Sequence, residues 1–270
     1  MRILERLAEL EEALALGRAG SELGLVPTMG ALHEGHHALI AAARAECDVV
    51  VASVFVNPAQ FGPEEDFDRY PRDEARDARI AEQWGVDFLF VPSVDELYPG
   101  GFQTWVEVEE IARGLEGEAR PGHFRGVATV CLKLFNLVRP QRAYFGQKDA
   151  QQAAVVERMA LDLNVPVSIR VVPTVRDEDG LAFSSRNAYL SDEEREAARA
   201  LPRALAAGAD AYGRGADPGE EARRVLAAEP LLAPEYVEVA RLNGRTYLLA
   251  AVRAGRTRLI DNVVLKGDPA

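Results

Sequence analysis

The stretch ELGLVPTMGALHEGHHALIAAARAECDVVVASVFV, residues 22–56, decides the fold. Its first part, 22–30, predicts a strand that enters a glycine-containing loop, and 36–47 predicts the helix that follows. The run at 48–56 is apolar apart from Asp48 and Ser53, which is typical of a strand buried on both faces of a parallel sheet. The stretch therefore predicts a β-α-β unit.

The same alternation continues along the first two-thirds of the chain. Repeated β-α-β units form a doubly wound parallel sheet, whose ligands bind beyond the carboxyl ends of the strands. We therefore predict a Rossmann-like α/β domain over residues 1–174, opened by a helix with Ile3, Leu7 and Leu10 on one face. Its further predicted elements are helix 73–85, strand 86–91, a helix with its apolar face at Val127–Val138, strand 142–146, helix 150–163 and strand 165–173.

The remaining residues have a different pattern. Ser191 to Glu194 forms a capping box, which predicts a helix to about residue 213, and a second helix is expected near 217–229. Strands are predicted at 236–240 and 246–265, the latter with a glycine-containing turn. We expect a small C-terminal α+β lid domain over residues 175–270.

Composition limits the functions that the chain can have. The net charge of −12 argues against broad nucleic-acid binding, because a phosphate backbone needs a basic face, but a small anion remains compatible. No run approaches the ~20 apolar residues of a membrane span, and no secretion pattern is present, so we expect a cytoplasmic protein. Cys47 and Cys131 are interpreted as reduced packing residues, with a catalytic thiol as the alternative.

The histidines are concentrated in two loops. His33, His36 and His37 share one loop, and His123 lies in another. In the first, Gly30 permits close backbone approach, the amides at the start of the following helix can face an anion, and two imidazoles at i and i+3 can face one phosphate. Two alternatives remain: a plain turn with exposed histidines, or a zinc site with H-x-x-H spacing.

Polar residues also follow the other predicted strands. Asn57 and Gln60 come directly after the strand at 48–56, where a side-chain amide can recognise a hydroxyl or carboxylate, and Tyr70 continues that loop. The alternative is an ordinary Asn-Pro turn. Arg120 and His123 lie at a helix start, where the helix dipole disfavours cations, so an anion docked there would explain them. The alternative is an ordinary solvated surface arginine.

Two more segments suit phosphate. Gly146–Asp149 lies between a strand and a helix, where Lys148 can reach phosphate oxygens and Asp149 can cap the helix or orient a metal. Ser184, Ser185 and Arg186 can form a flexible anion clamp. Each segment alone is also compatible with a plain loop. The case depends on all of them meeting at one edge of the sheet.

Taken together, these residues resemble the pantothenate synthetases, a family of the HIGH-motif nucleotidyltransferase superfamily. The resemblance covers residues 22–190. Its motifs are MGALHEGH (29–36), FVNPAQF (55–61), GHF (122–124), VRPQRAYFGQKDAQQ (138–152) and PTVRDEDGLAFSSRNAYL (173–190).

The resemblance implies a two-step reaction that uses ATP and Mg²⁺. The pantoate carboxylate attacks the α-phosphate, and the amine of β-alanine then attacks pantoyl adenylate, so that pyrophosphate and AMP are released. It also implies a homodimer and a set of site residues. His36 would be the proton donor, and the further catalytic residues would be His33, Lys148, Ser184, Ser185 and Arg186. ATP would be bound by Pro27, Met29–His36 (Met29, Gly30, Ala31, Leu32, His33, Glu34, Gly35, His36), Gly146–Asp149 (Gly146, Gln147, Lys148, Asp149), Val175 and Phe183–Arg186. Pantoate or β-alanine would be bound by Gln60 and Gln152, with Asn57, Tyr70, Arg120 and His123, and the candidate metal ligand is Asp149.

Two positions depart from the family pattern, since Phe183 stands where Met is usual and Gln147 where Glu is usual. Other functions remain open. A different nucleotidyltransferase would share the H-x-G-H motif but would not need Gln60 and Gln152, and a regulatory nucleotide-binding module would bind ATP without releasing pyrophosphate. The acidity of the chain and the absence of a substantial anticodon-binding domain disfavour a tRNA synthetase.

Overall fold

The computed structural model describes residues 1–17, 20–63 and 65–266. The chain divides into two compact units. The N-terminal unit comprises Met1–Gly146 and Gln151–Val172, and the C-terminal unit comprises Gln147–Ala150 and Pro173–Ala270. The sequence placed the division between residues 174 and 175 and assigned the short segment after residue 146 to the first domain. The last four residues of the predicted second domain lie outside the described residues.

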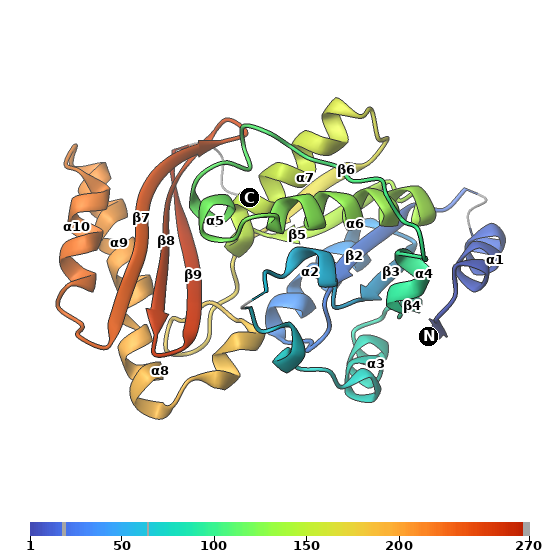
Figure 1. Ribbon diagram of the computed structural model, residues 1–270, viewed down its shortest axis with the longest axis horizontal. Coiled ribbons are helices and arrows are strands. Elements are labelled where there is room, and N and C mark those ends of the chain that lie inside the picture. Colours follow the sequence, from blue (N-terminus) through green and yellow to red (C-terminus); the bar gives the residue numbers. More distant parts are fainter. Residues whose placement is uncertain (18–19, 64, 267–270) are drawn as a thin grey trace. The chain divides into compact units, whose positions relative to one another are not determined.

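The N-terminal unit is built on a parallel sheet (Figure 1). β2 forms parallel ladders with both β3 and β5, so the strand order reverses at β2, as in Rossmann-type sheets. The fold class predicted from the sequence is thereby confirmed. In spatial order the described strands are β1 (Arg2–Leu4), β4 (Phe88–Phe90), β3 (Val49–Val54), β2 (Leu23–Thr28), β5 (Arg142–Gly146) and β6 (Ser168–Val172).

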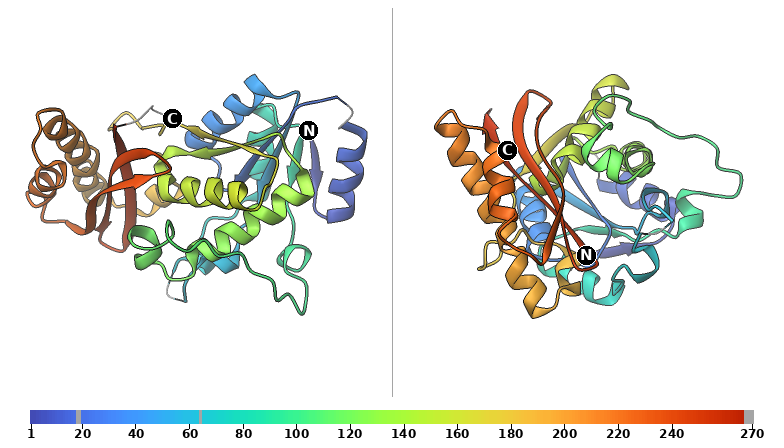
Figure 2. Two further views of the ribbon diagram at one scale, coloured as in Figure 1. Left: turned by 90° about the horizontal axis from the view of Figure 1, so that it is seen from above. Right: turned by 60° about the vertical axis from the view of Figure 1, so that its left-hand side comes forward.

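Helices cover both faces of this sheet (Figure 2). One face carries α2 (Glu34–Glu46) and α3 (Glu74–Gln83). Their apolar side chains belong to one buried cluster with side chains of the strands. The other face carries α1 (Leu7–Gly17), α6 (His123–Val138) and α7 (Ala150–Asp162). The short helices α4 (Val94–Leu97) and α5 (Leu115–Ala119) come before α6 in the chain.

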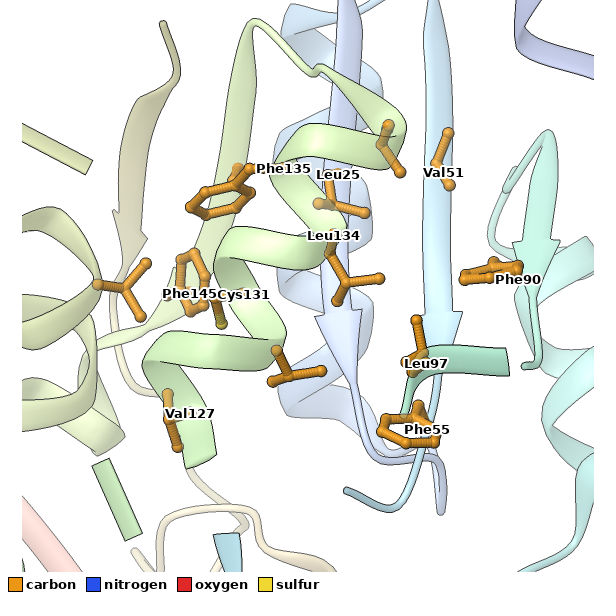
Figure 3. Close-up of a cluster of buried hydrophobic side chains, with 14 of the residues drawn as sticks. Leu25, Val51, Phe55, Phe90, Leu97, Val127, Cys131, Leu134, Phe135 and Phe145 are labelled. Carbon is orange, nitrogen blue, oxygen red and sulfur yellow. The ribbon is translucent and has the colours of Figure 1, made fainter. Parts of the chain in front are cut away.

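The apolar face of α6 packs on the strands, as its sequence pattern predicts. Figure 3 shows Val127, Cys131 and Leu134 among side chains of the sheet, and Phe135 beside them is 1% exposed. Burial raises the pKa of the Cys131 thiol to about 12, which keeps this group protonated and favours packing over catalysis.

The first residues correct one prediction. Arg2–Leu4 form β1, which pairs with β4, and the helix begins only at Leu7. Three residues are too few to show a strand pattern, and the helical spacing of Ile3 with Leu7 was a coincidence. Ile3 is 52% exposed.

The C-terminal unit contains a separate antiparallel sheet in the order β7 (Leu232–Leu242), β8 (Arg245–Ala254) and β9 (Thr257–Lys266). Helices α8 (Asp192–Ala198), α9 (Ala200–Gly213) and α10 (Pro218–Leu226) share an apolar cluster with this sheet. The sequence predicted one helix from residue 191 to about 213, but the structure ends α8 at Ala198 and begins α9 at Ala200.

We predict that Phe135→Ala lowers the free energy of unfolding by about 3–5 kcal/mol, because it leaves a cavity under α6. Leu161→Ala on α7 is the matched control, since Leu161 is 67% exposed and its removal should change stability by less than about 0.5 kcal/mol. Urea unfolding of both variants measures the difference. Equal losses would show that α6 does not hold the core.

Candidate functional site

The loop after β2 ends in a pair of histidines that cap α2 reciprocally. The amide of Gly35 donates to Nδ1 of His33 at 3.1 Å, and the amide of His33 donates to Nδ1 of His36 at 3.3 Å. The ring centroids lie 4.1 Å apart. This is a capping box in which imidazoles replace the usual Ser and Glu.

These bonds determine which ring nitrogen carries the proton. A nitrogen that accepts a hydrogen bond has no proton, so the neutral rings of His33 and His36 are protonated at Nε2. Each can then donate a hydrogen bond from Nε2 without becoming charged. The pair is thus suited to contact an anion at the positive end of a helix.

A buried carboxylate fixes the preceding turn. Asp77 of α3 is 1% exposed, and it accepts the amides of Ala31 and Leu32, both at 2.8 Å. Gly30 has φ +82°, and a Cβ there would lie 2.8 Å from Oδ2 of Asp77. Arg76 lies 3.6 Å from the same carboxylate and donates to the carbonyl of Leu32. The amides of Ala31 and Leu32 therefore point at Asp77, and an anion would have to use other donors.

The loop after β3 holds Gln60 in a buried position. This loop forms a short 3-10 helix, η1 (Pro58–Gln60), and Gln60 is 7% exposed. Asn57 donates to Oε1 of Gln60 at 3.1 Å and to the carbonyl of Gly126 at 3.2 Å. Nε2 of Gln60 donates to Sδ of Met29 at 3.0 Å. A thioether is a weak acceptor, so a ligand oxygen would be a better partner for this amide.

Glu65, Arg120 and His123 form a series of contacts that ends at the backbone carbonyl of Gln60. Arg120 forms a two-pronged ion pair with Glu65, at 2.9 and 2.6 Å, and also donates to Nε2 of His123 at 3.1 Å. Nδ1 of His123 lies 2.9 Å from the carbonyl oxygen of Gln60. Glu65 supplies a carboxylate for the cationic start of α6, where the sequence led us to expect a docked anion.

The two neighbours of His123 require opposite roles of its nitrogens. A carbonyl can only accept, so Nδ1 donates; a guanidinium can only donate, so Nε2 accepts. His123 is 6% exposed, and burial, together with the charge of Arg120, lowers its pKa to about 4. His123 is therefore neutral at pH 7 and positions Gln60.

Two other predicted residues also lie in the N-terminal unit. Tyr70 is 5% exposed, and its ring packs edge-on against Phe61 with centroids 6.0 Å apart. Gln152 is half-buried at the start of α7, and within the described ranges its amide has no hydrogen-bond partner. Its neighbour Gln151, by contrast, is buried and bonds to backbone groups of Ile111, Gly114 and Glu116.

The C-terminal unit contains the segment with Lys148. Gln147–Asp149 form a 3-10 turn, η3, and Nζ of Lys148 lies 4.0 Å from a carboxylate oxygen of Asp149. The side chain of Lys148 is 19% exposed, and that of Asp149 is 44% exposed. One cation and one acid thus share this turn.

The Ser-Ser-Arg segment follows a hairpin in the same unit. The amide of Phe183 donates to the carbonyl of Val175 at 3.0 Å, so these two predicted nucleotide contacts lie opposite each other. Ser184 accepts the amide of Arg186 at 3.2 Å and caps a short 3-10 helix, η4 (Ser185–Tyr189).

Ion pairs hold the base of this hairpin. Arg195 of α8 contacts Asp177 at 2.5 Å and Asp179 at 2.7 Å. Arg176 contacts the buried carboxylate of Asp261 at 2.6 Å. These ion pairs anchor the hairpin that leads into Ser184, and the predicted anion clamp of Ser184, Ser185 and Arg186 stays a prediction.

Within residues 1–17, 20–63 and 65–266, no group of three or more His, Cys, Asp or Glu side chains is arranged to hold a metal ion. The zinc alternative for His33 and His36 thus lacks its further ligands in that part of the chain. No helix in those ranges has the length and apolar character needed to cross a bilayer.

These features define a Rossmann-like α/β protein with a candidate anion site at a helix start beside the strand-order reversal. The family model described as Pantoate-beta-alanine ligase matches residues 2–264. The pantothenate synthetase of Chloroflexus aggregans is 53% identical over 279 residues, covering 98% of this chain and 100% of that protein.

Solved structures agree. The pantothenate synthetase of Thermus thermophilus has a TM-score of 0.94 and 48% identity, with 99% of this chain and 100% of that chain covered. The pantoate-beta-alanine ligase of Francisella tularensis, complexed with beta-gamma ATP and β-alanine, has a TM-score of 0.85 and 34% identity, and both chains are fully covered. The chain belongs to the pantoate-beta-alanine ligase family.

We predict that His123 makes stability depend on pH. Its pKa is about 4 in the folded protein and 6.5 in the unfolded chain, so the unfolded state binds more protons between these values. The stabilising contribution is complete above pH 6.5 and falls as the pH drops toward 4. Between pH 7 and pH 5 the loss should be about 2 kcal/mol.

Urea unfolding at both pH values, for the protein and for His123→Asn, isolates this group. The difference in unfolding free energy between the two proteins should shrink by that amount at pH 5. A difference that does not change with pH would mean that His123 is not buried in its neutral form.

Proposed function

We propose that the protein condenses pantoate with β-alanine at the expense of ATP, through a pantoyl-adenylate intermediate. The reciprocal capping of His33 and His36 at the start of α2 is the observation that carries this proposal. It supplies two fixed Nε2 donors for the α-phosphate, and the relatives named above include a ligase whose structure holds a form of ATP and β-alanine.

In the first step the carboxylate of pantoate attacks the α-phosphate of ATP, and pyrophosphate leaves. Negative charge grows on the phosphate oxygens in the transition state, and preorganised donors there lower the barrier. His33 and His36 take this role in the proposal as hydrogen-bond donors through Nε2. The role of proton donor, which the family resemblance implies for His36, would require the doubly protonated ring. Their Nδ1 atoms are engaged by backbone amides, so ring rotation is restricted before ATP binds.

In the second step the amine of β-alanine attacks the acyl carbon of the adenylate, and AMP leaves. A free carboxylate is a poor acyl donor, and AMP is a good leaving group. Gln60 and Gln152 would hold pantoate, with Gln60 also close to β-alanine. Asn57 fixes the Gln60 side chain, and Tyr70 would line the same site. Arg120 and His123, predicted to bind pantoate or β-alanine, contact Glu65 and the carbonyl of Gln60, so in this proposal they also position Gln60.

Each unit would supply its own group of ATP contacts. In the N-terminal unit these are Pro27, Met29–His36 and Gly146. In the C-terminal unit Lys148 and Arg186 would provide positive charge for phosphate oxygens, with Ser184 and Ser185 as hydroxyl donors. Gln147, Asp149, Val175 and Phe183 would complete the C-terminal group.

The metal is proposed as part of the substrate, Mg–ATP. Mg²⁺ is commonly held by one or two carboxylates together with substrate phosphates rather than by an all-protein cage. The half-exposed carboxylate of Asp149, at the turn that carries Lys148, suits such a single contact. A homodimer and a cytoplasmic location also belong to this proposal, and both rest on the family resemblance.

Pyrophosphate release from Mg–ATP is the decisive measurement. It should require pantoate, and AMP and pantothenate should appear only once β-alanine is added. Protein that is folded and binds ATP but releases no pyrophosphate with pantoate would contradict the proposal. That outcome would favour another acceptor or a regulatory module.

We predict that His33→Ala and His36→Ala each slow pantoate-dependent pyrophosphate release about 100-fold or more, as the loss of a single preorganised donor does. His37→Ala is the matched control. His37 stacks on Trp84 and pairs with Glu34 on the exposed side of α2, so its removal should change the rate less than about threefold. Full activity in either of the first two variants would refute the role given to that histidine.

A further inference from the structure

One buried amide on β9 holds the turn that carries Lys148. Nδ2 of Asn262 donates to two consecutive carbonyls, those of Gln147 at 2.8 Å and Lys148 at 2.9 Å. Its Oδ1 accepts Nε2 of Gln147 at 3.3 Å. Asn262 is 2% exposed, so water cannot replace these bonds easily. All of these residues belong to the C-terminal unit.

The residue before it holds the hairpin that leads to Ser184. Asp261 is 3% exposed, and its carboxylate accepts two hydrogen bonds from Arg176, at 2.6 and 3.1 Å. Arg176 also donates to the carbonyl of Gly180 and forms a β-bridge with Ala182. Oδ1 of Asp261 additionally accepts the amide of Asn262 at 2.8 Å, which links the two anchors.

We propose that Asp261 and Asn262 are positioning residues for ATP: Asn262 sets the turn of Lys148, and Asp261, through Arg176, sets the segment of Ser184–Arg186. Both phosphate-binding segments then depend on one dipeptide that is 85 or more residues away in the sequence from the groups it holds. The inference rests on the proposed function of Lys148 and Ser184–Arg186. It implies that the two segments move as one body with β9.

The variant Asn262→Asp tests the first anchor with almost no change of shape. It replaces two N–H donors with carboxylate oxygens that face the carbonyl oxygens of Gln147 and Lys148. The turn should be displaced, and kcat/KM for ATP should fall about 10- to 100-fold. Leu259→Ala on the same strand is the control for general loss of stability, because Leu259 belongs to the apolar cluster of the C-terminal unit.

A double-mutant cycle separates positioning from a merely structural role. If Asn262 acts through Lys148, Asn262→Asp should reduce activity less than about threefold when Lys148→Ala is already present. Additive losses, or full activity in Asn262→Asp, would overturn the proposal.

For the second anchor, Arg176→Lys keeps the positive charge but loses the paired hydrogen bonds to Asp261. KM for ATP should rise about fivefold or more, while kcat changes less. An unchanged KM would overturn the proposed role of Asp261.

Hydrogen exchange without ATP gives a readout that does not need activity. Asn262→Asp should speed exchange in peptides covering Gln147–Ala150, whereas α2 in the other unit should be unchanged. If the parent protein releases no pyrophosphate with pantoate, the proposed function fails while this result still decides the anchoring. Unchanged exchange in peptides covering Gln147–Ala150 would refute the anchoring itself.

Discussion

The backbone ladders on both sides of β2 are the constraint on which the N-terminal unit depends. β2 pairs with β3 along its whole length, Leu23–Thr28, and with β5 through Gly24 and Leu25. Space beside this strand is limited, since a Cβ on Gly24 would lie 2.9 Å from Sγ of Cys47. Backbone polar groups at the end of a strand buried in this way need hydrogen-bond partners. The hydroxyl of Thr28 supplies two such bonds, because it donates to the carbonyl of Ser53 and accepts from the amide of Gly30.

The turn that begins there is held by hydrogen bonds to the buried carboxylate of Asp77. Asp77 accepts the amides of Ala31 and Leu32, and these amides thereby lose the ability to bind an anion. In the proposed site, an anion would therefore be bound by the imidazoles and by the start of α2. Two Nε2–H donors at a helix start would suit a phosphate beside a buried carboxylate.

Much of the fold could be predicted from local pattern, whereas the supports of the site could not. The strand at 142–146 and the helix face on α6 follow from periodicity, and the loops at strand ends follow from the β-α-β order. No sequence pattern around Asp77, Glu65 or Asn262 predicts the contacts that these residues make. Each is an ordinary polar residue in its own segment, and its partner lies 45 to 115 residues away along the chain. Their contacts form only in the folded chain.

The same distant contacts change the meaning of the positive charges. Arg120 was interpreted as a ligand for an anionic substrate, but Glu65 neutralises it and His123 is held neutral beside it. In the proposed reaction the side-chain amide of Gln60 would contact pantoate. The groups that position Gln60, which are Arg120, Glu65 and His123, together carry no net positive charge. A carboxylate held by a guanidinium is stabilised before it reacts, and binding the ground state as tightly as the transition state adds nothing to the rate of the chemical step. Neutral amides can orient pantoate and leave its carboxylate nucleophilic, so the positive charge of the proposed site is directed at the phosphates, where charge develops.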